Sequence, residues 1–107
     1  MSRFVYRLIK PYEWSKGSSY FGTTKDKADG FIHLSTKNQV KGTFEKYFKD
    51  CDANLLVIDL EDVKTYGRVE WETSKSRGGE LFAHVYGPEG IRPSSIIDMI
   101  DMKDFKE

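Results

Sequence analysis

Cysteine and long apolar runs are scarce in this chain of 107 residues. The one cysteine, Cys51, cannot form an intramolecular disulfide and has no CxxC partner for thioredoxin-like chemistry. No apolar run approaches the roughly 20 residues that span a bilayer, and Arg3 and Arg7 interrupt the apolar start, where a signal peptide would carry its core. We therefore expect no membrane attachment and a cytoplasmic location.

Net charge is absent as well, because 17 basic residues balance 17 acidic ones. Without a field of one sign, the protein has no general attraction to nucleic acid or to an anionic membrane. The densest aromatic and basic stretch, residues 44–49, is typical of a helix with Lys46 and Lys49 on its solvent side. We expect no nucleic-acid partner.

Aromatic residues, by contrast, make up 14% of the chain, and the hydrophobic residues make up 38%. This composition is too apolar for a disordered chain, and the length suits one core. The sequence therefore predicts a single domain over residues 1–107. It leaves the oligomeric state open, with a monomer favoured.

Six short segments are rich in apolar, β-branched and aromatic residues and are separated by turn residues. We expect strands at residues 4–9, 31–34, 55–60, 69–74, 80–86 and 96–102, with the apolar run 55–60 in the centre of a sheet. Thr36 and Gln39 match a capping box, which predicts the main helix at about residues 36–49. The order shows no βαβ alternation and no repeat, so the expected fold class is α+β.

Two shorter helical pieces are expected before the main helix. Pro11 can open a short helix that carries Trp14. Residues 23–29 are polar and predict at most one helical turn, after a loop rich in glycine and serine at residues 16–22.

His33 is the first candidate site residue, because it stands in a short apolar run directly before a helix start. Such a junction combines exposed backbone N–H groups, the positive end of the helix dipole and an imidazole, which suits an anionic ligand. The alternative is a hydrogen-bonded histidine of the core. The pattern of residues leaves both open.

Glu80, His84 and Tyr86 have the same parity on one expected strand, so an unbroken pleat projects them on one face together with Phe82. This mixture of polar and aromatic side chains suits a ligand-binding face. The alternative is that this face is exposed to solvent, while the odd-numbered apolar residues of the strand pack inward.

Three other polar residues have structural alternatives of their own. Ser35 and Gln39 can be explained by helix capping, and Arg77 before two glycines can be an exposed turn residue or can clamp a phosphate. His33, His84 and Glu80 could in principle hold a zinc ion, but the chain has no HExxH helix. We expect no metal.

Several motifs occur together in one order: GFIHLST followed by Gln39, the pair Trp71–Glu72, and GGELFAHVYGP. They resemble the signatures of the domain-of-unknown-function 952 family, which are small single-domain proteins of bacteria and some eukaryotes. The resemblance covers residues 6–99. The family has no settled biochemical activity.

This resemblance implies a fold similar to that of the ADP-ribosyltransferase superfamily, a compact α+β fold of two packed, split β-sheets that cradle NAD. Tyr6–Arg7 resembles its first motif, in which an arginine or histidine contacts the dinucleotide. Residues 30–36 resemble its second motif and residues 80–86 its third, in which a glutamate begins a strand. His33 is then expected to face Glu80 across a cleft between the two sheets.

The resemblance also assigns roles. Glu80 and His33 would be catalytic, because a carboxylate beside the ribose stabilises the oxocarbenium-like state in which the bond to nicotinamide breaks, and a histidine can orient the ribose or accept a proton. Arg7 would pair with the pyrophosphate or hold the adenosine side. The expected ligand-binding residues are Arg7, Ser35, Gln39, Trp71, Arg77, His84 and Tyr86.

Two functions follow as alternatives. The first is an ADP-ribosyltransferase-like enzyme that uses NAD as its substrate, and the second is a non-catalytic module that binds a nucleotide or another small anionic ligand. The expected partner in both is a small molecule.

Overall fold

The structure is a computed structural model that describes residues 3–74 and 78–106. The described residues form six strands and three α-helices, with short 3₁₀ helices between them. The strands are β1 (Phe4–Ile9), β2 (Ile32–Leu34), β3 (Asn54–Asp59), β4 (Arg68–Thr73), β5 (Leu81–Tyr86) and β6 (Ile96–Asp101). The helices are α1 (Thr24–Asp29), α2 (Lys37–Tyr47) and α3 (Leu60–Val63), with 3₁₀ helices η1 (Pro11–Glu13), η3 (Pro93–Ser95) and η4 (Met102–Asp104).

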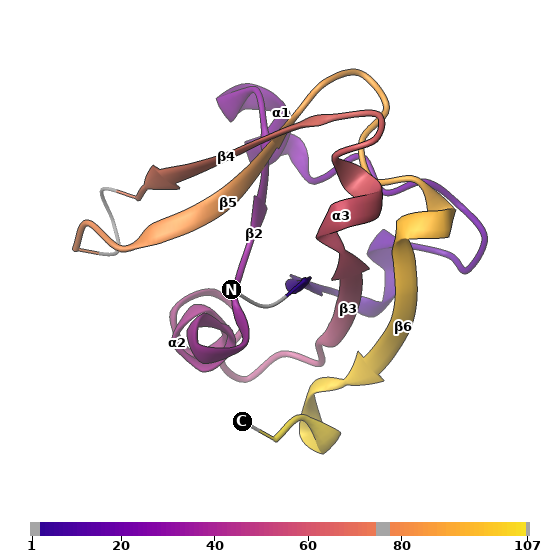
Figure 1. The fold of residues 1–107 in the computed structure, drawn as a ribbon. Coiled ribbons are helices and arrows are strands. Elements are labelled where there is room, and N and C mark those ends of the chain that lie inside the picture. Colours follow the sequence, from indigo (N-terminus) through magenta and orange to yellow (C-terminus); the bar gives the residue numbers. More distant parts are fainter. Residues whose placement is uncertain (1–2, 75–77, 107) are drawn as a thin grey trace.

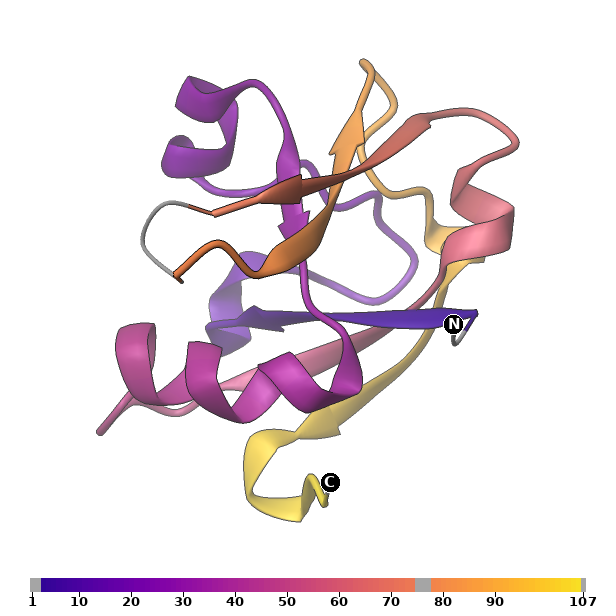
Figure 2. The ribbon, with the colours of Figure 1, turned by 60° about the vertical axis from the view of Figure 1, so that its left-hand side comes forward.

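The strands form two antiparallel sheets of three strands each, in the orders β1-β3-β6 and β2-β5-β4. Figures 1 and 2 show the two sheets as separate layers that cross each other, and Figure 2 shows α2 below β1 of the first sheet. The sheets meet at one bridge, where Tyr6 and Ser35 exchange backbone hydrogen bonds of 2.8 Å in both directions. Beyond this bridge β1 and β2 are not paired, so the two sheets stay separate. Two small antiparallel sheets with few helices confirm the expected α+β fold class.

The main core lies between the two sheets. Strand β3 is central in its sheet, and its side chains Leu56 and Ile58 are fully buried against Leu34 and Ala83 of the other sheet. A second cluster packs α2 on the opposite face of the first sheet, around Leu55. The burial of apolar side chains on both of its faces explains why β3 is a continuous apolar run.

Helix boundaries follow local capping signals. Thr36 and Gln39 form the expected capping box at the start of α2, and the Gln39 side-chain oxygen accepts from the Thr36 backbone N–H at 3.0 Å. Thr23 and Asp26 form a second capping box, so α1 extends over six residues rather than the single turn that was expected. Gly30 ends α1 in the left-handed region, with φ of 85°, where glycine has no steric penalty.

Most element boundaries match the sequence-based prediction within two residues. The expected first strand agrees with β1. The main helix was expected to end at about residue 49 and ends at Tyr47. Trp14 follows η1 instead of lying in it, and its indole N–H donates to the carbonyl of Ser18. The last expected residue of the third strand, Leu60, begins α3, because the Asp59 carboxylate caps the next backbone N–H groups.

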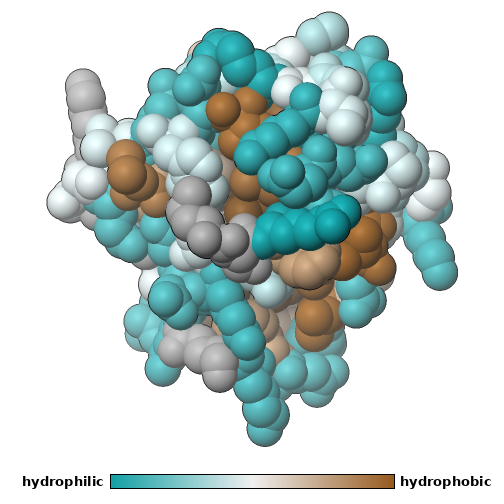
Figure 3. Space-filling model, in the orientation of Figure 1, coloured by the Kyte–Doolittle hydropathy of each residue, from teal (hydrophilic) through white to brown (hydrophobic). Residues whose placement is uncertain are grey.

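Exposed apolar side chains are scattered over the surface. The large ones are Tyr12, Phe21, Tyr47, Leu81, Ile97 and Met99. On the face drawn in Figure 3, hydrophobic atoms lie in separate small areas among hydrophilic ones. In the described part of the chain, none of the helices is both long and apolar enough to cross a membrane.

Candidate functional site

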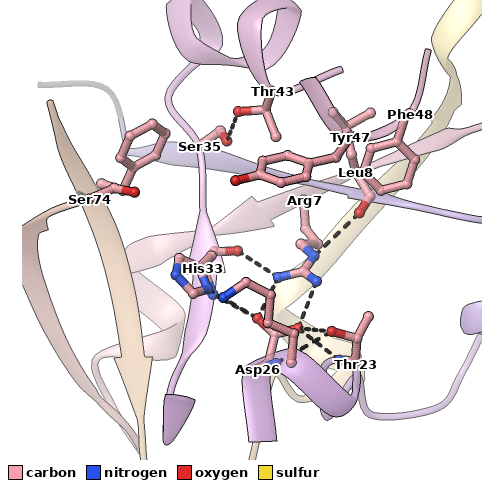
Figure 4. A pocket seen from close by; sticks show the side chains of 12 residues that line it. Arg7, Leu8, Thr23, Asp26, His33, Ser35, Thr43, Tyr47, Phe48 and Ser74 are labelled. Carbon is pink, nitrogen blue, oxygen red and sulfur yellow. Dashed lines mark hydrogen bonds and ion pairs between the residues drawn. The ribbon is translucent and has the colours of Figure 1, made fainter. Parts of the chain in front are cut away.

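A pocket of about 250 Å³ lies where β1 and β2 diverge beyond the Tyr6–Ser35 bridge. Its walls come from both of these strands, from α1 and α2, and from β5 and the end of β4. The lining side chains are Arg7, Leu8, Thr23, Lys25, Asp26, His33, Ser35, Thr43, Tyr47, Phe48, Ser74 and Phe82. Figure 4 shows α1 on one side of the pocket and α2 on the other. The structure therefore brings together three predicted site residues, Arg7, His33 and Ser35.

Arg7 is held on one wall by Asp26, a residue that the sequence analysis did not select. The guanidinium Nη1 lies 2.8 Å from Oδ1 of Asp26, and Nη2 lies 2.7 Å from Oδ2. Nη1 also donates to the backbone carbonyl of His33 at 3.0 Å. Since Asp26 occupies the edge of the guanidinium formed by Nη1 and Nη2, Arg7 does not present that edge to a pyrophosphate. Its expected role as a ligand-binding residue stays a prediction.

Asp26 is only 3% exposed and is surrounded by donors (Figure 4). Besides Arg7, the backbone N–H and hydroxyl of Thr23 donate to its Oδ2, and the backbone N–H of His33 donates to its Oδ1. Burial alone would raise the pKa of Asp26, but the hydrogen bonds from His33 and Arg7 outweigh it and hold that pKa well below its usual range. Asp26 is therefore a carboxylate, which accepts hydrogen bonds only.

The His33 ring is anchored by the same carboxylate. Its Nδ1 lies 3.3 Å from Oδ1 of Asp26, and its Nε2 lies 3.9 Å from Oδ2 of Asp29, too far for a hydrogen bond. The His33 side chain is 34% exposed and lines the pocket. It is therefore a pocket residue and not a filler of the core.

A second anchored histidine lies beside the first. His84 on β5 is the direct cross-strand partner of His33 on β2, and their ring centroids are 4.7 Å apart. Oε1 of Glu72 lies 2.8 Å from Nδ1 of His84 and also accepts from the hydroxyl of Tyr86. The donors Tyr86 and His84 lower the pKa of Glu72, so this carboxyl group is ionised at neutral pH.

His84 is 3% exposed because Phe31 covers it. The Phe31 and His84 rings are stacked, with centroids 4.0 Å apart, and Phe31 also contacts the rings of His33 and Tyr86. Burial lowers the pKa of His84, although Glu72 opposes this shift. Among the described residues, Nε2 of His84 has no hydrogen-bond partner.

The structure corrects two expectations about β5. His33 does not face Glu80 across a cleft between two sheets, because β2 and β5 are neighbours in one sheet and the residue opposite His33 is His84. The even-numbered face of the strand is not a solvent face either, since Phe82 and His84 are buried. Of the odd-numbered residues expected to pack inward in that alternative, Leu81 is 53% exposed, whereas Ala83 and Val85 are buried as expected.

Glu80 lies directly before β5 and close to the start of α2. The side-chain amide of Gln39 donates to Oε2 of Glu80 at 3.3 Å and to the carbonyl of Leu81 at 2.7 Å. Gln39 therefore caps α2 and ties it to β5, and it does not line the pocket. Glu80 accepts a backbone hydrogen bond from Ser74, which does line the pocket.

Trp71 remains outside this arrangement. Trp71 packs against the core between the sheets, on the face of β4 that also carries Val69. Arg77 lies outside the described residues. Within the described ranges, no group of three or more His, Cys, Asp or Glu residues is arranged to hold a metal ion.

Three residues of the site were missed from the sequence: Asp26, Glu72 and Phe31. The signal for Asp26 was its place three residues after Thr23, as in a capping box. Glu72 was recognised only as part of a family motif. Phe31 gave no signal of its own, since an aromatic residue in a short apolar run is explained by a strand.

The comparisons with known proteins give a family and a solved relative. The family described as Protein of unknown function (DUF952) matches residues 8–99. The crystal structure of protein CC0527 from Caulobacter crescentus is similar, with 31% sequence identity and a TM-score of 0.76, and the match covers 92% of this chain and 84% of that one. A double methionine mutant of CC0527 gives the same values. No curated protein gives a significant match.

Proposed function

The chain belongs to the family described as Protein of unknown function (DUF952), and from this premise we propose that the pocket beside Arg7 and His33 binds a nucleotide or part of one, with NAD as a leading ligand. The observation that carries the proposal is the place of the pocket, at the point where β1 and β2 diverge. Strands from both sheets thus contribute side chains to one small cavity, which suits a ligand held between them.

The lining favours a planar ring with polar substituents. Tyr47, Phe48 and Phe82 supply aromatic surface, and the hydroxyls of Ser35 and Thr43 lie on the same side of the pocket (Figure 4). Aromatic walls with a few placed polar groups are typical of small-molecule sites. A nucleobase or nicotinamide ring with its sugar has this combination of flat surface and hydrogen-bonding groups.

The volume limits how much of the ligand can enter. Pockets for drug-sized molecules measure roughly 300–1,000 Å³, so a cavity of about 250 Å³ accommodates one ring and its sugar rather than a whole dinucleotide. Phosphates would then lie at the mouth. Lys25 is the lining cation nearest to solvent, with 70% of its side chain exposed, although it also pairs with Asp29 at 3.0 Å.

A catalytic form of this function is ADP-ribosyl transfer, and the position of Glu80 favours it. Its backbone carbonyl accepts from Ser74, which lines the pocket together with Phe82, so Glu80 is the acidic residue directly before β5 that we propose for the ribose. In this reaction the ribose–nicotinamide bond breaks, an acceptor atom bonds to the ribose carbon, and the acceptor proton passes to a base such as His33. Without this step the protein is a binding module.

Incubation with NAD tests the proposal. At a ligand concentration ten times Kd, binding to the native state raises the free energy of unfolding by about 1.4 kcal/mol, or roughly 6–11 °C in Tm for a small domain. Thermal unfolding and release of nicotinamide should be followed for the wild type and for Glu80→Gln, with Glu61→Gln on the exposed surface of α3 as a matched control.

Three outcomes are distinguishable. Stabilisation by NAD with nicotinamide release that is lost only in Glu80→Gln supports the enzyme. Stabilisation without release supports the binding module. If millimolar NAD, AMP and nicotinamide all leave Tm unchanged, the proposed pocket function is wrong.

A further inference from the structure

The chain has two histidines, and the fold places them side by side. His33 and His84 are direct partners on the antiparallel strands β2 and β5, so their side chains project from the same face of the sheet. Their ring centroids are 4.7 Å apart, with an angle of 73° between the ring planes. Sequence spacing does not reveal this pair, because its members lie on strands that are far apart along the chain.

A carboxylate orients each ring through its Nδ1 atom. Oδ1 of Asp26 lies 3.3 Å from Nδ1 of His33, and Oε1 of Glu72 lies 2.8 Å from Nδ1 of His84. Because an ionised carboxylate can only accept, Nδ1 carries the proton in each ring and Nε2 keeps a lone pair. A histidine that binds a metal ion through one nitrogen almost always donates the N–H of its other nitrogen in this way.

Both Nε2 atoms are without a hydrogen-bond partner among the described residues. That of His84 is buried, and that of His33 lies 3.9 Å from Oδ2 of Asp29, beyond hydrogen-bond distance. Phe31 stacks on the face of the His84 ring, whereas the lone pair of Nε2 lies in the plane of that ring. The His33 side chain is 34% exposed, so solvent reaches the pair from its side.

The separation of the two rings fits a shared metal ion. A metal about 2.0–2.1 Å from Nε2 lies roughly 3.2 Å from the centroid of that ring, so two rings on one metal at angles of about 90–110° have centroids roughly 4.5–5.2 Å apart. The observed distance of 4.7 Å lies within this range. The strand pairing therefore holds the rings at a suitable spacing before any metal binds.

The surroundings restrict the kind of metal. Within the described ranges no third His, Cys, Asp or Glu completes a metal-binding group with the pair, so water has to supply the other ligands. Asp26 already pairs with Arg7, and Asp29 already pairs with Lys25. Two neutral imidazoles with water suit Cu²⁺, Ni²⁺ or Zn²⁺, whereas Mg²⁺ and Ca²⁺ require oxygen ligands.

We propose that His33 and His84 together bind one Cu²⁺, Ni²⁺ or Zn²⁺ ion through their Nε2 atoms. Asp26 and Glu72 are positioning residues, which keep the protons on Nδ1. The expectation of no metal followed from sequence spacing, and the pairing of β2 with β5 changes it. The inference goes beyond the proposed function and does not depend on a nucleotide in the pocket.

Titration calorimetry on the full chain, freed of metal with a chelator, tests the site. We expect one equivalent of Cu²⁺ to bind more tightly than Ni²⁺ or Zn²⁺, and Mg²⁺ to give no binding. Electron paramagnetic resonance of the bound Cu²⁺ should show splitting from two imidazole nitrogens. Splitting from one nitrogen or none overturns the proposal. So does a lack of saturable binding for all three metals, which would leave water as the sufficient partner of both Nε2 atoms.

Substitutions of the ligands give a second test. His33→Asn and His84→Asn should each lower the affinity for Cu²⁺ at least tenfold, whereas Cys51→Ser, which removes the exposed thiol, should leave it unchanged. Unchanged affinity in His33→Asn, or a tenfold loss in Cys51→Ser, contradicts the site even if His84→Asn does not fold.

The role of Glu72 has its own readout. Nitrogen-15 NMR of the metal-free wild type should show Nδ1 protonated in both rings, and Glu72→Gln should move part of the His84 population to the other tautomer and weaken Cu²⁺ binding about tenfold. Glu89→Gln is the matched control, because its ion pair with Arg92 is exposed. A proton on Nε2 of His84 in the wild type would contradict the proposal.

Discussion

Arg7 and Asp26 form a bidentate ion pair that joins β1 to α1, with N–O distances of 2.8 and 2.7 Å. The Arg7 side chain is 14% exposed and that of Asp26 is 3% exposed, so the pair is largely withdrawn from water. Asp26 also anchors both the backbone and the ring of His33. The carboxylate of Asp26 is therefore the structural centre of the site.

Replacing Asp26 should destabilise the protein strongly. Asp26→Asn leaves the buried Arg7 without its counter-charge, and the loss of one partner from a buried pair costs about 3–5 kcal/mol. Urea unfolding measures this change. Asp29→Asn is a matched control, because its pair with Lys25 is exposed and should contribute less than about 1 kcal/mol. Equal losses in the two variants would contradict the importance of the buried pair.

Below about pH 6.5 the free energy of unfolding should decrease as the pH is lowered, because of His84. Burial lowers the pKa of His84 in the folded protein, so between this lowered value and about 6.5 the unfolded chain binds more protons than the folded one. Stability is therefore complete above about pH 6.5 and is lost as the pH falls toward the folded pKa. Free energies of unfolding between about pH 5 and 8 should show this slope, and His84→Gln should reduce it. An unchanged slope in that variant would refute the assignment to His84.

Tyr20 should be the last tyrosine to ionise, and its hydroxyl should be dispensable. Burial raises the pKa of Tyr20 to about 12, and its hydroxyl has no hydrogen-bond partner among the described residues. Removing an unpartnered buried hydroxyl is neutral or stabilising, so Tyr20→Phe should change stability by between 0 and about +1 kcal/mol. Alkaline absorbance titration should lose its highest transition in this variant and keep it in Tyr12→Phe, whose side chain is exposed. A destabilisation above about 1 kcal/mol would show that the hydroxyl is bonded.

Gly90 should tolerate substitution much less well than Gly17. Both have positive φ, but a Cβ at Gly90 would lie 2.6 Å from the backbone oxygen of Tyr20, while nothing lies within 4 Å of one at Gly17. Gly17→Ala should therefore cost only the conformational strain, about 1–2 kcal/mol. Gly90→Ala should cost more, because the bridge between Tyr20 and Ile91 must move as well. Similar losses in thermal unfolding would contradict this difference.

Local patterns predicted the elements well. The β-branched and aromatic residues of β1, the apolar run of β3 and the capping box of α2 each depend on neighbours in the sequence, and these elements were found where expected. The fold class followed from their order. The short helix α3 was missed because its signal is a single cap, Asp59, at the end of a long apolar run.

The site was harder to predict, because its contacts depend on how distant segments meet. His33 was recognised, but the partner facing it is decided by the register of β2 on β5, which no local pattern gives. Likewise, the charge of Arg7 predicted that an anionic group would pair with it. Only the packing of α1 beside β2 shows that this group is the carboxylate of Asp26. Glu72 reaches His84 through the pairing of β4 with β5.

The order of the strands along the chain has a consequence for synthesis. The β2-β5-β4 sheet is complete once Tyr86 has been added, but the other sheet takes its strands from residues 4–9, 54–59 and 96–101. Until residues 96–101 leave the ribosome, one edge of the central β3 has no partner while its apolar side chains are already present. That interval is when a nascent chain is most exposed to pairing with another chain, so chaperone contact is expected to concentrate there.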